Sequence, residues 1–241
     1  MIKAITLDLD DTLWEVWPTL IAAEKTLHQW LNNHCPDISA LLADNGLMSI
    51  RQRVLSDEPD LMHRVSEMRL RVLEQALLKV GYSPSWAQQA AQSAFEVFLE
   101  ARHQVTFYPL VIDVLDNLSR NYRLAALSNG NANVYRLGLG KYFSFGLNAE
   151  MVGIGKPHPA MFEQALEKLE LRADQVIHVG DNPTDDVIGA QQLGMHTVWV
   201  NPEKLDWPTD NPSPNAEIEC MEQLPASIEF IISELINTEP G

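Results

Sequence analysis

Residues 7–14 of the chain read LDLDDTLW and complete an apolar, partly β-branched run that begins at residue 2. Such a run indicates a buried strand over about residues 2–9 that ends in an acidic loop. Because side chains alternate along a strand, Asp8 and Asp10 project to the same side of its C-terminal end. In an open α/β sheet ligands bind outside that end, so the loop is the first candidate site.

The Asp8–Asp10 pair permits two interpretations. Two carboxylates this close repel each other unless a cation lies between them, and the pair therefore suggests a hard, oxygen-liganded metal such as Mg²⁺. An acidic turn at the end of a strand, capped by Thr12, would give the same letters without any metal. The loop alone leaves both interpretations open.

The rest of the chain divides into two parts with different hydrophobic patterns. From residue 18 to about residue 104 no segment reads as a strand, and apolar residues recur at helical spacing. After residue 108 strands and helices alternate, which predicts a parallel sheet covered by helices on both faces. In the first part, helices are expected from residue 18, over residues 61–80 and from Ser83-Pro84. In the second part, strands are expected at residues 124–127, 145–147, 176–179 and 197–200, with helices at residues 161–169 and 185–193.

Two of the later loops could hold an anion. The strand expected at residues 124–127 runs into Ser128, Asn129 and Gly130. The Ser128 hydroxyl and the backbone amides after it could bind a phosphoryl oxygen, although the same letters are common in turns. Lys156 lies in GIGKPHP, a loop punctuated by glycine and proline. Held rigidly there, its ammonium could neutralise a phosphate or a carboxylate, and a solvated surface lysine is the alternative.

A further acidic group follows the strand expected at residues 176–179, which ends in Gly180-Asp181. Asp181 lies at the strand tip and fits a third metal ligand. Asp185 and Asp186 fall in the first turn of a helix, where the helix dipole favours acids in any protein.

Taken together, four strand ends carry, in order, DxD, Ser, Lys and GDxxxxD. Over nearly its whole length the chain resembles the haloacid dehalogenase-like hydrolase superfamily, and the helical segment after the DxD loop is similar to that superfamily's C1-type cap. The resemblance implies a doubly wound, Rossmann-like α/β core with a parallel sheet of strand order 5-4-1-2-3. It places the core at residues 1–15 and 106–241 and an inserted all-α cap at residues 16–105.

The resemblance also implies roles for the residues of the four motifs. Asp8 is expected to be the nucleophile and Asp10 the general acid and base, while Asp8, the main-chain carbonyl of Asp10 and Asp181 would hold Mg²⁺. Asp186, the last acid of GDxxxxD, would orient the motif lysine or metal-bound water, but Asp185 fits a shorter variant, so the choice between them stays open. Phosphoryl oxygens would be bound by Thr12, Ser128, Asn129, Gly130 and Lys156.

Asp10 also discriminates within the superfamily. Dehalogenases have an aromatic residue at that position and need no metal, so an acid there favours hydrolysis of a phosphate ester. The chain is similar to the branch that contains bacterial flavin mononucleotide phosphatases, which also act on a phosphorylated ribitylaminouracil precursor of riboflavin. Sugar phosphates, nucleotides, a phosphomutase reaction and a phospho-acceptor signalling domain are the alternatives. Trp14 and Trp17 are expected to pack at the start of the cap, with stacking on a substrate ring as the other option.

Composition limits the partners. Seventeen Lys and Arg residues against 33 Asp and Glu residues give a net charge of −16, which disfavours nucleic acid and anionic membranes. Two cysteines far apart in sequence fit a reducing compartment, and no apolar run reaches the roughly 18 residues of a membrane span. We therefore expect a soluble cytoplasmic protein that binds a small phosphate ester, with monomer and dimer both left open.

Overall fold

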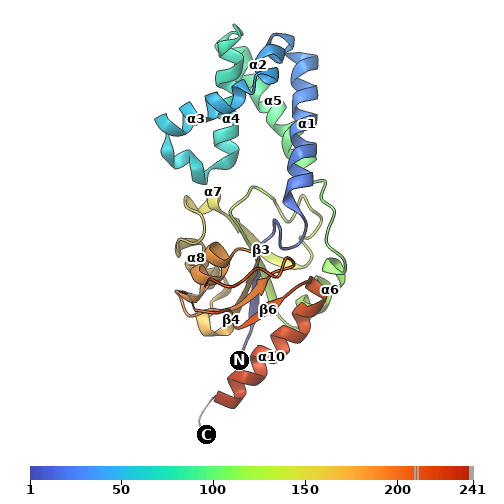
Figure 1. Ribbon diagram of the computed structural model, residues 1–241, viewed down its shortest axis with the longest axis vertical. Helices are drawn as coiled ribbons and strands as arrows, with labels where there is room; N and C mark the ends of the chain where they lie inside the picture. Colours follow the sequence, from blue (N-terminus) through green and yellow to red (C-terminus); the bar gives the residue numbers. More distant parts are fainter. Residues whose placement is uncertain (209, 211, 239–241) are drawn as a thin grey trace. The chain divides into compact units, whose positions relative to one another are not determined.

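The computed structural model describes residues 1–208, 210 and 212–238. The chain forms two compact units, shown in Figure 1. Met1–Glu15 and Thr106–Gly241 make the first, which we call the core unit, and Val16–Val105 make the second, which we call the helical unit. None of the described helices is long and apolar enough to cross a lipid bilayer.

The core unit is built on one parallel sheet. Within the described residues it has six strands in the order β3-β2-β1-β4-β5-β6. The expected order 5-4-1-2-3 is confirmed, and β6 extends the sheet beyond β5 as an edge strand that the sequence did not predict, because it is only three residues long. The strands are β1 Ala4–Leu7, β2 Arg123–Ser128, β3 Phe143–Asn148, β4 Val176–Gly180, β5 His196–Val200 and β6 Ala216–Ile218.

Helices cover both faces of this sheet. Figure 1 shows α8 on one side and α6 with α10 on the other. Along α8 the buried residues Met161, Phe162, Ala165 and Leu169 recur at helical spacing and form one apolar stripe, which explains why this segment is a helix that lies on the sheet. The helices of the core unit are α6 Val111–Ser119, α7 Ala149–Val152, α8 Ala160–Leu169, α9 Gly189–Gln191 and α10 Leu224–Thr238, with a π-helical turn at Pro183–Ile188 and 3₁₀ turns at Ala173–Gln175 and Met221–Gln223.

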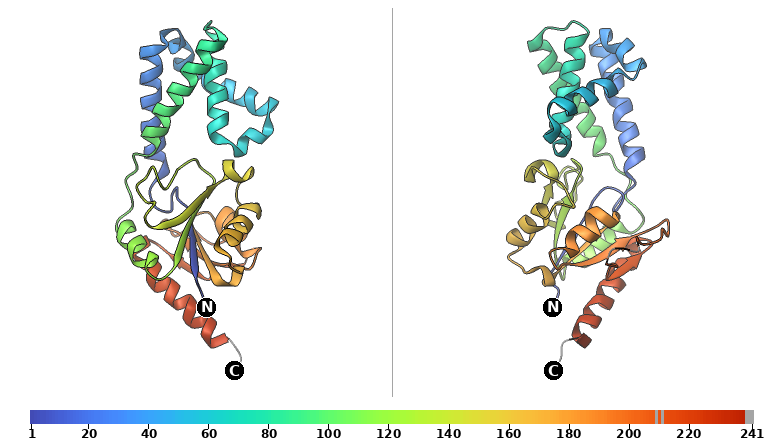
Figure 2. Two further views of the ribbon diagram at one scale, coloured as in Figure 1. Left: turned by 180° about the vertical axis from the view of Figure 1, so that it is seen from behind. Right: turned by 60° about the vertical axis from the view of Figure 1, so that its left-hand side comes forward.

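The helical unit has its own apolar core. Ala23, Leu27 and Leu31, four residues apart along α1, are fully buried, and α1 lies beside α5 in both views of Figure 2. The helix expected over residues 61–80 begins only at Val65, because a separate 3₁₀ turn precedes it. The helices are α1 Val16–His34, α2 Ser39–Ala43, α3 Gly46–Asp57, α4 Val65–Lys79 and α5 Pro84–Arg102, with 3₁₀ turns at Pro36–Ile38 and Pro59–His63.

Trp14, at the end of the first core segment, and Trp17, at the start of the helical unit, differ in exposure. Trp14 is fully buried, and its ring meets Phe107 edge-on with centroids 5.9 Å apart, so it packs as expected. Trp17 is 67% exposed, so the packing expected of it is wrong and its ring stays open to contact.

Strand register brings the acidic loops together. β1 is the central strand: Leu7 lies opposite Ala126 of β2 on one side and opposite Val179 of β4 on the other. The residues that follow these three strands therefore emerge at one edge of the sheet, and the backbone N–H of Asp8 extends the ladder by donating to the Val179 carbonyl at 2.9 Å.

Candidate active site

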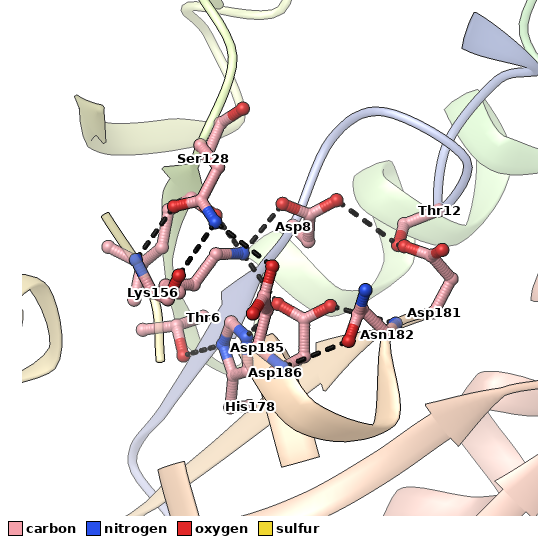
Figure 3. A network of polar contacts seen from close by, with 12 residues as sticks. Thr6, Asp8, Thr12, Ser128, Lys156, His178, Asp181, Asn182, Asp185 and Asp186 are labelled. Atoms are coloured by element: carbon pink, nitrogen blue, oxygen red, sulfur yellow. Dashed lines mark hydrogen bonds and ion pairs between the residues drawn. The ribbon is translucent and has the colours of Figure 1, made fainter. Parts of the chain in front are cut away.

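Asp8 occupies the centre of this edge. Its side chain is buried, and Figure 3 shows it between Lys156 and Thr12. Oδ1 accepts a hydrogen bond from the Lys156 Nζ at 2.6 Å, and Oδ2 accepts a long one from the Thr12 hydroxyl at 3.5 Å. One carboxylate oxygen is thus firmly bound and the other only weakly.

The Lys156 ammonium forms hydrogen bonds with three acceptors of the cluster. Its buried Nζ donates to Asp8 Oδ1 at 2.6 Å, to Asp186 Oδ1 at 2.5 Å and to the Leu127 carbonyl at 2.7 Å. An ammonium has three protons, so its donors are fully used. A phosphoryl oxygen can therefore bind Nζ only by sharing or displacing one of these acceptors.

Asn129 holds the loop that carries this lysine. Its Oδ1 accepts from the Lys156 backbone N–H at 2.7 Å, and its Nδ2 donates to the Lys156 carbonyl at 2.9 Å. A Cβ atom at Gly155 would come within 2.6 Å of Asn129 Oδ1, so the close approach needs glycine there. The Asn129 side chain is engaged with the loop, and the contact to phosphoryl oxygens that the sequence predicted would fall to its backbone amide.

Ser128 ends β2 beside this loop. The side chain is buried, and its Oγ accepts a hydrogen bond from the Gly130 N–H at 3.0 Å. Among the described residues the hydroxyl proton has no acceptor in hydrogen-bonding distance. It is therefore available to donate to an anion.

The structure distinguishes Asp185 from Asp186, between which the sequence did not decide. Asp186 is buried, and its Oδ2 accepts from the Asn182 N–H at 3.0 Å while its Oδ1 accepts from Lys156. Asp185 is half-buried and accepts from Asn129 Nδ2 at 3.1 Å instead. Asp186 is the acid that contacts the lysine.

Burial and charge set the pKa values of these groups in opposite directions. Burial raises the pKa of Asp8 well above its ordinary value, and Lys156 only partly offsets this. Burial also acts to raise the pKa of Asp186, but Lys156 and His178 outweigh it, so this pKa is lowered. For Lys156 burial acts to lower the pKa, and Asp186 and Asp8 outweigh it, so the pKa is raised and the ammonium stays charged. Burial, with Asp186 and Asp11, raises the pKa of Asp181 to about 7.

The cluster has the donors that a hard divalent cation requires. Carboxylate oxygens of Asp8, Asp181 and Asp186 lie within 4.8 Å of one another. The single hydroxyl proton of Thr12 is shared between Asp181 Oδ1 at 3.3 Å and Asp8 Oδ2 at 3.5 Å. An oxygen-only set of this kind fits Mg²⁺. The side chain of Asp10 is not part of the group, and the sequence had assigned it only a main-chain carbonyl at the metal.

Two polar residues of the network were missed at the sequence level. His178, on β4, is buried and its Nε2 lies 3.1 Å from Asp186 Oδ1, while its Nδ1 lies 2.8 Å from the hydroxyl of Thr6 on β1. Both interrupt strands that are otherwise apolar, and that interruption is the signal that could have found them. Strand prediction rests on apolar residues, and a single polar residue within such a strand leaves the prediction unchanged.

A model of the haloacid dehalogenase-like hydrolase family matches residues 2–194. The chain belongs to this family. Among its relatives is the 5-amino-6-(5-phospho-D-ribitylamino)uracil phosphatase YigB of Escherichia coli (strain K12), 36% identical over 205 residues, which are 85% of this chain and 86% of YigB. Another is the phosphoserine phosphatase of Thermus thermophilus, 36% identical over 139 residues, which are 55% of this chain and 54% of that protein.

Solved structures of the haloacid dehalogenase-like family also match. A crystal structure named as 2-haloacid dehalogenase from Pseudomonas syringae pv. Tomato DC3000 superposes with a TM-score of 0.91 and 45% identity, covering 95% of this chain and 99% of that one. An L-2-haloacid dehalogenase from Xanthobacter autotrophicus matches at 0.61 and 20% identity, which shows the shared fold.

Gly180 should be indispensable for the position of Asp186. A Cβ atom there would lie 2.2 Å from Asp186 Cγ, so Gly180→Ala must displace the carboxylate that holds Lys156. We expect a loss of about 1–3 kcal/mol in the free energy of unfolding and a loss of about 100-fold in hydrolytic activity from the misplaced group. Urea unfolding and steady-state assays measure the two effects. Gly146→Ala on β3 is the matched control, because its Cβ would meet the nearest side chain at an ordinary 3.4 Å; equal effects of the two substitutions would contradict the argument.

The raised pKa of Asp181, about 7, makes stability depend on pH. Between the ordinary carboxyl value and about 7, the metal-free native state holds a proton that the unfolded chain has lost, so its free energy of unfolding falls as pH rises across this window. A divalent cation bound at this cluster would replace that proton and lower the carboxyl pKa. The rise in Tm caused by saturating Mg²⁺ should therefore be larger above about pH 7 than near pH 5. Differential scanning fluorimetry with Mg²⁺ and with EDTA tests this, and Asp181→Asn should flatten the difference.

Proposed function

We propose that this protein is a Mg²⁺-dependent phosphatase that forms a phospho-aspartyl intermediate on Asp8. The observation that carries the proposal is the setting of Asp8, which is buried, bound to Lys156 at 2.6 Å and grouped with Asp181. A second acid, Asp10, follows two residues later. This combination supplies a nucleophile, a fixed cation, a metal position and a proton carrier.

Halide displacement is the second candidate, because the Pseudomonas syringae structure with 45% identity is named a 2-haloacid dehalogenase. Two features favour phosphate chemistry. An acid stands at position 10, where the resemblance to the superfamily implies an aromatic residue in dehalogenases, and three carboxylates converge as a cation would require. The Escherichia coli and Thermus thermophilus relatives are both named phosphatases.

Asp8, the Asp10 carbonyl and Asp181 would hold the Mg²⁺, with Asp186 beside them, and the bound ion would neutralise charge on the phosphoryl oxygens and on the carboxylates. Burial raises the pKa of Asp8 well above its ordinary value, and Lys156 only partly offsets this. The raised pKa agrees with a site in which added positive charge favours the ionised, nucleophilic form of Asp8.

In the first step an Asp8 oxygen attacks phosphorus while the ester P–O bond breaks. Asp10, as the carboxylic acid, donates its proton to the departing oxygen, and the alcohol leaves. Ser128 has an uncommitted hydroxyl proton for one phosphoryl oxygen, and Lys156 shares a proton with another. Donors held in place before reaction stabilise the transition state because they need no reorientation.

In the second step the Asp10 carboxylate takes a proton from water, and the water oxygen attacks phosphorus. The bond from phosphorus to the Asp8 oxygen breaks, which regenerates the carboxylate and releases inorganic phosphate. Asp10 thereby returns to its acid form. Each turnover consumes one ester and one water.

For the substrate we propose a small phosphorylated metabolite, with flavin mononucleotide or a phosphorylated riboflavin precursor first. The support is the similarity to YigB, whose name specifies a phosphoribitylaminouracil phosphatase. Sugar phosphates, nucleotides and a phosphomutase reaction are the alternatives. We assign selectivity to the helical unit as a cap, since the core treats all phosphoryl groups alike.

Unpaired Cys35 and Cys220 support a cytoplasmic location.

A substrate screen tests the proposal directly. Purified protein should release phosphate from phosphorylated metabolites over many turnovers with Mg²⁺, and EDTA should abolish this release. Parallel reactions with 2-chloropropionate should release no halide. Halide release without phosphate release would establish the dehalogenase instead, and one phosphorylation without turnover would point to a signalling domain.

Two aspartate variants separate the roles of the acids. Asp8→Asn should lower kcat by about 10⁴-fold or more, because no nucleophile remains. Asp10→Asn should lose far less with an aryl phosphate, whose leaving group needs little protonation, than with an alkyl phosphate. Steady-state kinetics on both ester types give the comparison. Equal losses on the two esters would contradict the role of Asp10, and more than a few per cent of residual activity in Asp8→Asn would contradict that of Asp8.

A further inference from the structure

Behind the reacting groups lies a buried polar chain that begins with two residues, Thr6 and His178, which the mechanism above does not use. It runs from the Thr6 hydroxyl to His178 Nδ1 at 2.8 Å and from His178 Nε2 to Asp186 Oδ1 at 3.1 Å. From there it continues through Lys156 to Asp8, at 2.5 and 2.6 Å. Figure 3 shows the five side chains in this succession. Thr6 and His178 lie opposite each other on adjacent parallel strands.

The chemistry of the acceptor fixes the direction of the central hydrogen bond. An ionised carboxylate can only accept, so His178 Nε2 must carry a hydrogen and donate it to Asp186, whichever charge the ring has. The other ring nitrogen is hydrogen-bonded to Thr6, and the imidazole and the Phe162 ring are nearly perpendicular, with centroids 5.1 Å apart. The imidazole is therefore fixed both in its plane and about its axis.

Packing alone does not explain these two residues. Both are essentially fully buried on central strands whose other side chains are apolar, where a valine or leucine would fill the space without desolvating a polar group. What the pair adds is a second donor to the oxygen of Asp186 that already binds Lys156. That oxygen is held from two sides, while Oδ2 is held by the Asn182 N–H at 3.0 Å.

We infer that His178, oriented by Thr6, is a positioning residue that fixes the Asp186 carboxylate and through it directs the Lys156 ammonium at Asp8. The inference rests on the proposed function for its catalytic consequence. Without the Nε2 donor, Asp186 keeps its charge partner but loses one of its three anchors. Lys156 then samples positions that favour Asp186 over Asp8, and the nucleophile loses its fixed cation in a fraction of the molecules.

Three substitutions test this inference through kinetics. His178→Leu removes the donor, and we expect kcat for an aryl phosphate to fall about 10- to 100-fold with KM changed less than about twofold. His178→Gln keeps an N–H that can reach Asp186 and should recover most of the loss. Thr6→Val removes the orienting hydroxyl and should lower kcat about fivefold. In the His178→Leu background Thr6→Val should have no further effect, because both act through one chain.

His196→Leu on β5 is the control for losing a histidine from the same sheet, and it should leave kcat unchanged. Equal losses in the Leu and Gln variants would overturn the inference, as would wild-type kcat in a folded His178→Leu. A loss of kcat that is explained by partial unfolding of the variant at the assay temperature, as its lowered Tm would show, would also overturn the inference. If His178→Leu does not fold, Thr6→Val and His178→Gln still decide, because only a positioning role predicts a fivefold loss in the first and near-normal kcat in the second.

A measurement that does not depend on activity distinguishes a failure of this inference from a failure of the proposed function. In protein carrying isotope-labelled histidine, long-range proton–nitrogen NMR should show His178 with a hydrogen on Nε2, and Asp186→Asn should shift that signal. Wild-type protein without any phosphatase activity would refute the proposed function and leave this readout intact. An Nε2 without a hydrogen in the wild type would refute the positioning role even in an active phosphatase.

Discussion

The ammonium of Lys156, held between the carboxylates of Asp8 and Asp186, is the interaction on which the site depends. Removing one partner of a buried ion pair costs about 3–5 kcal/mol, because the other charge is then stranded in a medium that cannot solvate it. Here one cation serves two anions, and Asp181 adds a third nearby. One ammonium does not balance three carboxylates. Burial and the neighbouring acids therefore raise the pKa values of Asp8 and Asp181. A proton or a metal ion must complete the site.

The fold meets this requirement by using adjacent strand ends and close backbone approaches. Asp8 follows β1, Ser128 ends β2 and Asp181 follows β4, so the parallel register alone assembles most of the groups. Lys156 comes from a loop between elements, where register gives no help, and Asn129 fixes that loop through both backbone groups of the lysine. The absence of a side chain at Gly180 leaves the room in which Asp186 turns inward.

Membership of the haloacid dehalogenase-like family fixes the scaffold and leaves the chemistry to individual side chains, since one fold hosts many reactions. A relative of 45% identity is named a dehalogenase, and YigB, at 36%, is named a phosphatase. Identity over the whole chain therefore does not choose between carbon–halogen and phosphorus–oxygen cleavage. In our proposal the choice lies with residues that carry protons and hold cations, above all Asp10, because a phosphate ester needs its leaving oxygen protonated and a halide does not.

The sequence by itself predicted the class of fold and placed Asp8, Ser128 and Asp181 at strand ends, because apolar periodicity and motif order are local properties of the chain. The order of the five principal strands came from the resemblance to the superfamily. The sequence also placed Lys156 at a strand end, which is wrong, because α7 lies between β3 and the lysine loop. It left open whether Asp185 or Asp186 meets Lys156, since both acids share one helical turn and differ only in the direction in which they point. Tertiary structure decided for Asp186, through the π-helical turn and the space at Gly180. Thr6 and His178 also became visible only there. They are 172 residues apart, and a hydrogen bond between two strands exists only once the sheet has brought them to the same register.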